Sequence, residues 1–223
     1  MLGSDARFQC IYTEHIDAKS LVHCRQPNSD VSNASISDSR RILADIASAL
    51  SFVHGSNIVH NDIKLANILY SPVRGAVLID FGLSFVTGHP LPTGGTPWYL
   101  APEFARGWQF RGPPSDIWAL GVVMLWLLGR IPMPETTPHW SIAHIHPTGT
   151  MQAFNIDANE AMARWHTRVD NARLGLERRG EALYAVVDDI LASSLDNRMT
   201  AAELEQKMVD IYRQYTSEDK ARS

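Results

Sequence analysis

Residues 58–69 read IVHNDIKLANIL, and residues 76–82 read AVLIDFG. Each stretch contains a short apolar run of four or five residues, and the segment 71–75 between them, SPVRG, is rich in turn-forming residues. Two apolar runs joined by such a segment predict a β-hairpin. The remainder of the chain is most easily understood around this hairpin.

Three polar residues lie at the open end of the predicted hairpin. Asp62 and Asn67 precede the first strand, and Asp80 follows the second. Because the two outer ends of a hairpin lie together, we expect these side chains to converge. A base, an amide oxygen and a second carboxylate suit phosphoryl transfer, in which a protein mainly positions groups and neutralises charge through Mg²⁺.

Two more motifs follow in order, Ala101-Pro102-Glu103 and the segment 116–121, which reads DIWALG. With HNDIKLAN and DFG, they resemble the catalytic core of the eukaryotic protein kinases. Each motif alone also fits ordinary turn and capping residues, but the four in this order favour the family. Small-molecule kinases share the Asp…Asn…Asp arrangement but usually lack the last two motifs, so the resemblance is to protein kinases.

The resemblance implies a mainly α, protein-kinase-like α+β fold. We expect a helical C-terminal lobe with a β-hairpin at the catalytic loop, and an N-terminal lobe that is largely missing from this chain. The implied division is residues 1–16 as a remnant of the N-terminal lobe and hinge, 17–215 as the C-terminal lobe, and 216–223 as a polar tail.

The resemblance also assigns catalytic and metal-binding roles. Asp62 would accept or orient the proton of the substrate hydroxyl, and Lys64 would neutralise the transferred phosphate. Asn67 and Asp80 would hold Mg²⁺. Lys64 together with Thr96, in the segment GTPWY, is more similar to serine/threonine kinases than to tyrosine kinases, so Thr96 completes the expected catalytic set.

The nucleotide contacts are expected near the start of the chain. Residues 8–16 are rich enough in β-branched and aromatic residues for a strand. By resemblance, Thr13 would guard the back of the ATP pocket, and Glu14 to Ile16 would offer backbone groups to adenine. Asn67 and Leu69 complete the expected cofactor-binding set. An ordinary core strand without a ligand stays open as the alternative for residues 8–16.

Four further residues have structural roles by resemblance. His60 would be a packed core histidine that supports Phe81, Asp116 would hold the backbone around His60, and Arg198 would pair with Glu103. Asn61 is a departure, because most kinases have an arginine there that receives a phosphate on the activation loop. We therefore interpret three residues as ordinary loop residues: Ser84, Thr87 and Thr93.

Helical periodicity marks the other elements. It predicts a helix from Ser37 or Ser39 to Gly55 and, near the C-terminus, helices over 159–174, 180–191 and 200–215, the last with a capping box between Thr200 and Glu203. The apolar run 117–129 is too short for a bilayer and predicts a helix buried on every side. Four histidines could either bind a metal or have surface or capping roles: His139, His144, His146 and His166. The surface or capping roles are favoured, because no Cys or nearby carboxylate completes a metal site.

Composition limits the partners and the compartment. The chain has 223 residues and a formal net charge of −4, with no long basic run, so neither nucleic acid nor a membrane surface is an expected partner. Cys10 and Cys24 are its two cysteines, and the start lacks the apolar block of a signal peptide. These features predict an intracellular protein, cytoplasmic or nuclear.

The expected function is ATP- and Mg²⁺-dependent phosphoryl transfer to Ser or Thr hydroxyls of a protein. A complete kinase also has a Gly-rich loop, a strand lysine and a helix glutamate, none of which we find in the chain. Three hypotheses follow: an active kinase whose missing parts are encoded upstream of Met1, a catalytically inactive pseudokinase or interaction module, and a gene fragment. The first is preferred, because a lobe kept only for docking has no need of the metal-binding residues.

Overall fold

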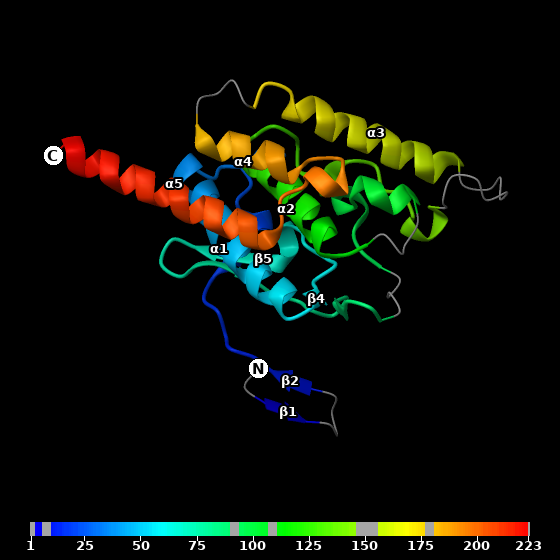
Figure 1. The fold of residues 1–223 in the computed structure, drawn as a ribbon. Coiled ribbons are helices and arrows are strands. Elements are labelled where there is room, and N and C mark those ends of the chain that lie inside the picture. The colour runs from blue at the N-terminus through cyan, green and yellow to red at the C-terminus, as the bar shows by residue number, and fades with distance from the viewer. Residues whose placement is uncertain are drawn as a thin grey trace.

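The computed structural model describes residues 3–5, 10–89, 94–106, 111–145, 156–176 and 181–222. The helices in this part of the chain are α1 (Ile36–Gly55), α2 (Pro113–Leu127), α3 (Ile156–Arg173), α4 (Ala182–Ile190) and α5 (Ala201–Arg222). The strands are β1 (Gly3–Asp5), β2 (Cys10–Tyr12), β3 (Lys19–Ser20), β4 (Ile58–Val59), β5 (Ile68–Ser71), β6 (Gly75–Leu78) and β7 (Phe85–Val86). Figure 1 shows that helices make up most of the body, as predicted.

Helix α2 forms the centre of the core. Every residue from Asp116 to Leu127 is buried, and α2 contacts each of the other four long helices. It approaches α4 so closely that a Cβ added at Gly121 would lie 2.6 Å from Leu191 Cγ. The prediction of a helix buried on every side is confirmed, although α2 ends at Leu127, two residues before Gly129.

Helix α1 carries an apolar stripe that faces this core, formed by Ile42, Leu43, Ile46, Leu50 and Val53. Its start is fixed by a capping box, in which Ser35 Oγ accepts from Asp38 N at 3.0 Å and the Asp38 carboxylate accepts from Ser35 N at 3.3 Å. The helix therefore begins at Ile36, slightly before the predicted position, and ends at Gly55 as predicted.

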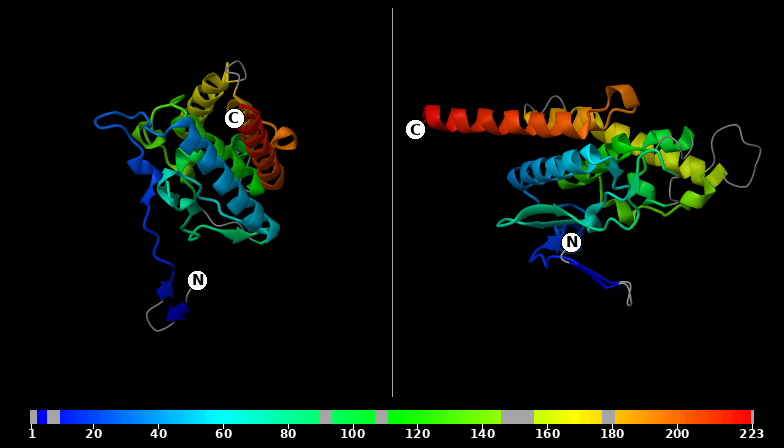
Figure 2. Two further views of the ribbon diagram at one scale, coloured as in Figure 1. Left: turned by 90° about the vertical axis from the view of Figure 1, so that its left-hand side faces the viewer. Right: turned by 60° about the horizontal axis from the view of Figure 1, so that its bottom comes forward.

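The three C-terminal helices lie close to the predicted ranges. Helices α3 and α4 differ from the prediction by a few residues at their ends. The predicted capping box before α5 is confirmed, because Thr200 N donates to Glu203 Oε2 at 2.8 Å. The predicted end at Tyr215 is wrong, since α5 continues through the polar tail to Arg222. Figure 2 shows α5 running along α1 and projecting beyond it.

The predicted hairpin is confirmed as the antiparallel pair β5 and β6, in register from Ile68 opposite Leu78 to Ser71 opposite Gly75. Gly75 has φ +90° at the turn, a conformation that favours glycine. The hairpin is tied to α1, because Asp45 Oδ2 accepts from Ala76 N at 2.8 Å. Strand β3 extends this sheet beside β5, and β4 pairs with β7.

The predicted strand over residues 8–16 is only partly correct. In the described residues, β2 covers Cys10–Tyr12 and pairs with β1, whereas residues 13–18 adopt no regular structure. Both views place the β1–β2 pair away from the helical body (Figures 1 and 2). Its pairing partner among the described residues is β1, which is only three residues long.

No helix within the described ranges is both long enough and apolar enough to cross a lipid bilayer.

Candidate active site

The loop before the hairpin is held by a carboxylate from α2. Asp116 Oδ2 accepts from His60 N at 2.8 Å, and its Oδ1 accepts from Asn61 N at 2.8 Å. His54 from α1 also contacts Oδ2, at 2.9 Å. Asn61 has φ +69°, so these bonds stabilise a strained backbone immediately before Asp62. The predicted structural role of Asp116 is confirmed.

His60 is fully buried, and its contacts fix the tautomer of its ring. Asp62 N lies 3.3 Å from His60 Nδ1, and because a backbone N–H only donates, Nδ1 is an acceptor. Nε2 therefore carries the hydrogen and donates to Ile79 O at 3.0 Å. The ring meets that of Phe81 edge-on, with centroids 4.7 Å apart. The prediction of a packed core histidine supporting Phe81 is confirmed.

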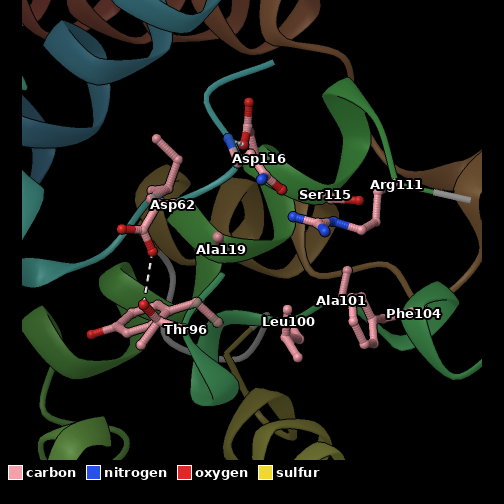
Figure 3. Close-up of a pocket in the computed structure, with 12 residues that line it drawn as sticks. Asp62, Thr96, Leu100, Ala101, Phe104, Arg111, Ser115, Asp116 and Ala119 are labelled. Carbon is pink, nitrogen blue, oxygen red and sulfur yellow. Dashed lines mark hydrogen bonds between the residues drawn. The ribbon is translucent and has the colours of Figure 1, made fainter. Parts of the chain in front are cut away.

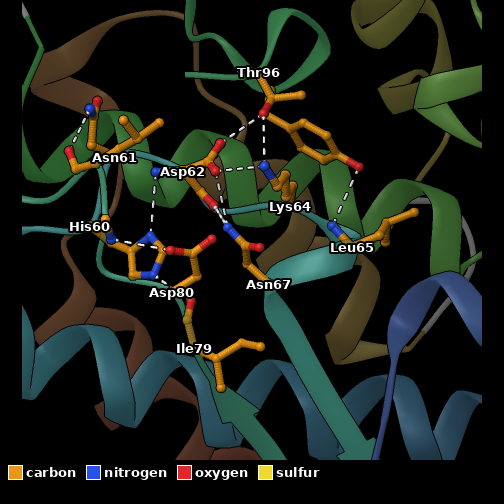
Figure 4. Close-up of polar contacts among 12 residues, drawn as sticks. His60, Asn61, Asp62, Lys64, Leu65, Asn67, Ile79, Asp80 and Thr96 are labelled. Atoms are coloured by element: carbon orange, nitrogen blue, oxygen red, sulfur yellow. Dashed lines mark hydrogen bonds and ion pairs between the residues drawn. The ribbon is translucent and has the colours of Figure 1, made fainter. Parts of the chain in front are cut away.

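Three predicted catalytic residues lie in one hydrogen-bonded group, as Figure 4 shows. Asp62 Oδ2 accepts from Lys64 Nζ at 2.6 Å, and its Oδ1 accepts from Thr96 Oγ1 at 2.7 Å. Lys64 Nζ also lies 3.4 Å from Thr96 Oγ1. Lys64 and Thr96 together neutralise and orient a carboxylate that is itself largely buried.

Asn67 is held on the other side of Asp62. Its Nδ2 donates to Asp62 O at 2.9 Å and to Asp62 Oδ2 at 3.0 Å. Because both partners are acceptors, the amide nitrogen must face them, and the amide oxygen Oδ1 points away. The side chain is therefore oriented with an oxygen ligand available.

Asp80 lies next to this amide. Ile79 N donates to Asn67 O at 3.0 Å, which brings the end of β6 against the backbone of Asn67, and Figure 4 draws the Asp80 carboxylate beside Asn67. Asp80 has φ +65° and is exposed, and its Oδ1 accepts from Gly82 N at 3.2 Å. An exposed carboxylate beside a buried amide that has its oxygen free fits a Mg²⁺ ion that keeps several waters.

The family model described as "Protein kinase domain" matches residues 4–209. The chain belongs to the protein kinase family.

Proteins similar to this kinase chain include serine/threonine-protein kinases and a CBL-interacting protein kinase. It is 39% identical over 102 residues to a probable serine/threonine-protein kinase of Dictyostelium discoideum, covering 45% of the chain and 7% of that protein. It is 32% identical over 135 residues to CBL-interacting protein kinase 25 of Oryza sativa, covering 56% and 26%. It is 40% identical over 100 residues to serine/threonine-protein kinase SIK2 of Gallus gallus, covering 43% and 12%. The matched region is a minor part of each of these relatives.

The residues predicted to contact adenine do not belong to the hydrogen-bonded group around Asp62. Thr13 and Glu14 are exposed, Ile16 is half-buried, and the Glu14 carboxylate lies 3.3 Å from Arg74 Nη2 in the hairpin turn. Leu69 is half-buried in β5, opposite Val77. The structure thus brings together the predicted catalytic and metal-binding residues but leaves Thr13 and Glu14 facing solvent.

The histidines of the metal hypothesis do not gather within the described residues. The His139 ring lies against Trp98 at 5.7 Å. His166 is half-buried and packs against Trp118, and its Nε2 lies 2.8 Å from the backbone oxygen of Leu100, the residue that ends the 3-10 helix Pro97–Tyr99. The side chain of His144 and the whole of His146 fall outside the description. In the described part of the kinase chain, no group of three or more His, Cys, Asp or Glu could hold a metal ion.

The pairing of Arg198 with Glu103 is confirmed, with Nη1 to Oε1 at 2.7 Å and Nη2 to Oε2 at 2.9 Å. Asn61, in place of the family's arginine, donates from Nδ2 to Leu83 O at 2.9 Å. The Asn61 side chain therefore binds the backbone of the loop that follows Asp80.

Sequence reasoning missed the roles of three residues near the site: Tyr99, Glu135 and Arg111. Tyr99 donates its hydroxyl to Glu135 Oε1 at 2.7 Å, and burial raises the pKa of Glu135 above its usual value of 4.5. Arg111 lines a pocket with Asp62, Thr96 and Asp116 (Figure 3), and burial lowers the pKa of its guanidinium to about 10. Tyr99 lies in the GTPWY segment, but no local motif marks its partner Glu135 or Arg111, because both reach the site only through the tertiary fold.

Proposed function

We propose that this chain transfers the γ-phosphoryl group of ATP to Ser or Thr hydroxyls of a protein substrate. The observation that carries the proposal is the group formed by Asp62, Lys64 and Thr96, with Asn67 and Asp80 beside it. Phosphoryl transfer needs little covalent chemistry from a protein, so a positioned base and charge neutralisation are its main requirements.

The contacts of each residue in the group suit a particular role in phosphoryl transfer. Asp62 accepts or orients the proton of the substrate hydroxyl, and Lys64, bound to Asp62 Oδ2, neutralises charge on the transferred phosphate. Thr96 holds the second oxygen of the same carboxylate. Asn67 and Asp80 would hold Mg²⁺, which supplies charge neutralisation on the phosphates when bound.

We propose the domain division on the same grounds. Residues 17–215 would be the C-terminal lobe, residues 1–16 a remnant of the N-terminal lobe and hinge, and residues 216–223 a tail. Support comes from the placement of the helices and the catalytic hairpin after residue 17, whereas residues 3–5 and 10–16, the described part before it, contain the short β1–β2 pair. We also propose that adenine is contacted by Thr13, Glu14, Ile16 and Leu69. These contacts require residues 13–16 to close over the nucleotide.

A second candidate is a catalytically inactive interaction module. The exposure of Thr13 and the pairing of Glu14 with Arg74 favour it, because both predicted adenine contacts face solvent. An ATP site open to water stabilises transition-state charge poorly, since the surrounding dielectric is high.

Transfer of radiolabel from γ-labelled ATP to serine-containing protein or peptide separates the two candidates. We expect label incorporation by the unaltered chain, and its loss in Asp62→Asn and Asp80→Ala. Asp210→Asn, at an exposed carboxylate on α5, is the matched control and should keep activity. If the unaltered chain incorporates no label and Mg-ATP raises the melting temperature of neither it nor Asp80→Ala, the chain as given is not a kinase and the second candidate holds.

A further inference from the structure

Tyr99 joins the two segments that supply the partners of Asp62. Its backbone N donates to Thr96 O at 3.0 Å. Its hydroxyl oxygen accepts from Leu65 N at 3.5 Å (Figure 4), and Leu65 directly follows Lys64. Thr96 and Lys64 bind the two carboxylate oxygens of Asp62. One buried tyrosine therefore contacts both segments on which the orientation of this carboxylate depends.

The N–H group of Leu65 depends on the Tyr99 hydroxyl for its acceptor. Leu65 is the first residue of the 3-10 helix Leu65–Asn67, and the first N–H groups of a helix have no acceptor within that helix. Lys64, the residue before this helix, does not cap it with its side chain. Because Leu65 is fully buried, loss of the hydroxyl would leave its N–H unpaired and would loosen the backbone next to Lys64.

Glu135 holds the tyrosine hydroxyl from the other side. The hydroxyl donates to Glu135 Oε1 at 2.7 Å. Because a phenol has one hydrogen, only its lone pairs are left for Leu65, so the hydrogen bonds run in one direction from Leu65 N to the carboxylate. Buried hydrogen bonds linked in this way strengthen one another. Burial, together with the Glu135 carboxylate, raises the pKa of Tyr99 well above its usual value of 10, so the hydroxyl keeps its proton.

Glu135 reaches the catalytic group through this chain of hydrogen bonds. It lies in the 3-10 helix Pro134–Thr136, on the segment that follows α2. Burial raises the pKa of Glu135, and the charge of Lys64 opposes that rise, so the two groups are close enough to interact. The Lys64 ammonium itself contacts Asp62 and Thr96, at 2.6 and 3.4 Å. The hydrogen-bonded connection between Glu135 and Lys64 therefore runs through Tyr99.

We propose that Tyr99 and Glu135 are positioning residues, which hold Lys64 in place against Asp62 for phosphoryl transfer. Neither is a catalytic residue, because each acts through the position of Lys64. The inference rests on the proposed function for the reaction that Lys64 serves. The hold on the backbone of Leu65 exists without nucleotide and is measurable without phosphoryl transfer.

The first test is hydrogen exchange of the Leu65 amide, followed by NMR without nucleotide. Tyr99→Phe keeps the ring and removes the hydroxyl, so we expect exchange to become about tenfold faster, the equilibrium effect of one hydrogen bond. Tyr70→Phe is the matched control, because the Tyr70 hydroxyl also donates to a carboxylate, Asp38 Oδ1 at 2.6 Å, but on α1. Unchanged exchange in Tyr99→Phe, or equal acceleration in Tyr70→Phe, would overturn the proposal.

The second test is steady-state transfer of radiolabel from ATP. In Tyr99→Phe we expect kcat to fall about tenfold, with the KM for ATP within about twofold of its original value, because Lys64 acts on the phosphate in transfer. Glu135→Leu should lose the same activity. Glu135→Gln, which can still accept from Tyr99, should restore most of it. A loss in Glu135→Gln as large as in Glu135→Leu would contradict positioning through the hydrogen bond.

A double variant separates positioning of Lys64 from a general structural role. In Lys64→Met, the further change Tyr99→Phe should lower kcat by less than about twofold, because the ammonium through which Tyr99 acts is absent. A further tenfold fall would show that Tyr99 acts independently of Lys64 and would overturn the proposal. If the unaltered chain transfers no label, the proposed function fails by itself, and hydrogen exchange at Leu65 still decides whether Tyr99 holds this backbone. Should Glu135→Leu fail to fold, Tyr99→Phe decides alone.

Discussion

Arg198 donates from Nη1 and Nη2 to the two carboxylate oxygens of Glu103, at 2.7 and 2.9 Å, across 95 residues of sequence. Both side chains are almost completely buried, at 0% and 2% exposure. Arg198 also donates to Ala192 O and Pro114 O. The contact therefore joins the segment before α2 to the turn before α5.

Replacing Glu103 with Gln should strongly destabilise the fold. The change leaves the Arg198 guanidinium buried beside a neutral group, and losing one partner of a buried pair costs about 3–5 kcal/mol. Urea unfolding measures the loss. Glu160→Gln, in an exposed pair with Arg164, should change the free energy of unfolding by less than about 1 kcal/mol. Similar losses in the two variants would show that the buried pair has no special weight.

Replacing Asp116 with Asn should disturb the catalytic loop. The two carboxylate oxygens accept from different backbone N–H groups, of His60 and Asn61, and an amide can offer an oxygen to only one of them. We expect a loss of about 1–3 kcal/mol in the free energy of unfolding, from one buried donor without a partner. Phosphoryl transfer should fall as well, because Asn61 at positive φ precedes Asp62. Asp210→Asn provides the comparison, and unchanged stability of Asp116→Asn would contradict the anchoring role.

Simultaneous replacement of Ser84, Thr87 and Thr93 with Ala should leave activity unchanged. The Asn61 side chain donates to Leu83 O, and its amide cannot make the paired charge-assisted bonds that bind a phosphate. Ser84 Oγ donates to Phe81 O at 2.7 Å, as in an ordinary turn. Thr93 lies outside the described residues. A radiolabel assay compares the triple variant with the unaltered chain. A large drop would mean that a basic group other than residue 61 reads a phosphate there, and Arg111 in the adjoining pocket would be examined first.

The contribution of Glu135 to the free energy of unfolding should decrease as pH rises. Burial raises the pKa of its carboxyl in the folded state above 4.5, so the folded chain holds this proton more tightly than the unfolded chain. Its contribution to stability is therefore greatest below pH 4.5 and is lost as pH rises through the raised pKa. Glu135→Gln can still accept from Tyr99 but does not titrate. Urea unfolding across pH should decline less steeply in this variant, and parallel curves would contradict the assignment.

Elements governed by local pattern could be predicted from the sequence. The stripe from Ile42 to Val53 is enough to define α1, and the unbroken apolar run around Gly121 is enough to define a buried α2. The hairpin followed from apolar runs around a turn segment. The approach of Asn67 to Asp62 also followed, because both residues lie on one short loop.

Features that depend on distant partners could not be predicted in this way. The pairing of Tyr99 with Glu135 and the place of Arg111 arise from packing around α2, and no spacing in the sequence encodes them. The length of the strand predicted over residues 8–16 was overestimated, because β propensity does not show which strand it will pair with. The last helix was underestimated at Tyr215, since polar residues such as Glu218, Lys220 and Arg222 favour a helix as readily as a tail.

The most direct test of the proposed chemistry is a crystal of the chain grown with Mn²⁺ and a non-hydrolysable ATP analogue, examined by anomalous diffraction. Manganese takes the oxygen ligands that magnesium does and can be located by its own signal. The account predicts a peak bound by Asn67 Oδ1 and the Asp80 carboxylate, absent from Asp80→Ala. A peak at other residues, or none at all beside Asn67 in the unaltered chain, would contradict it.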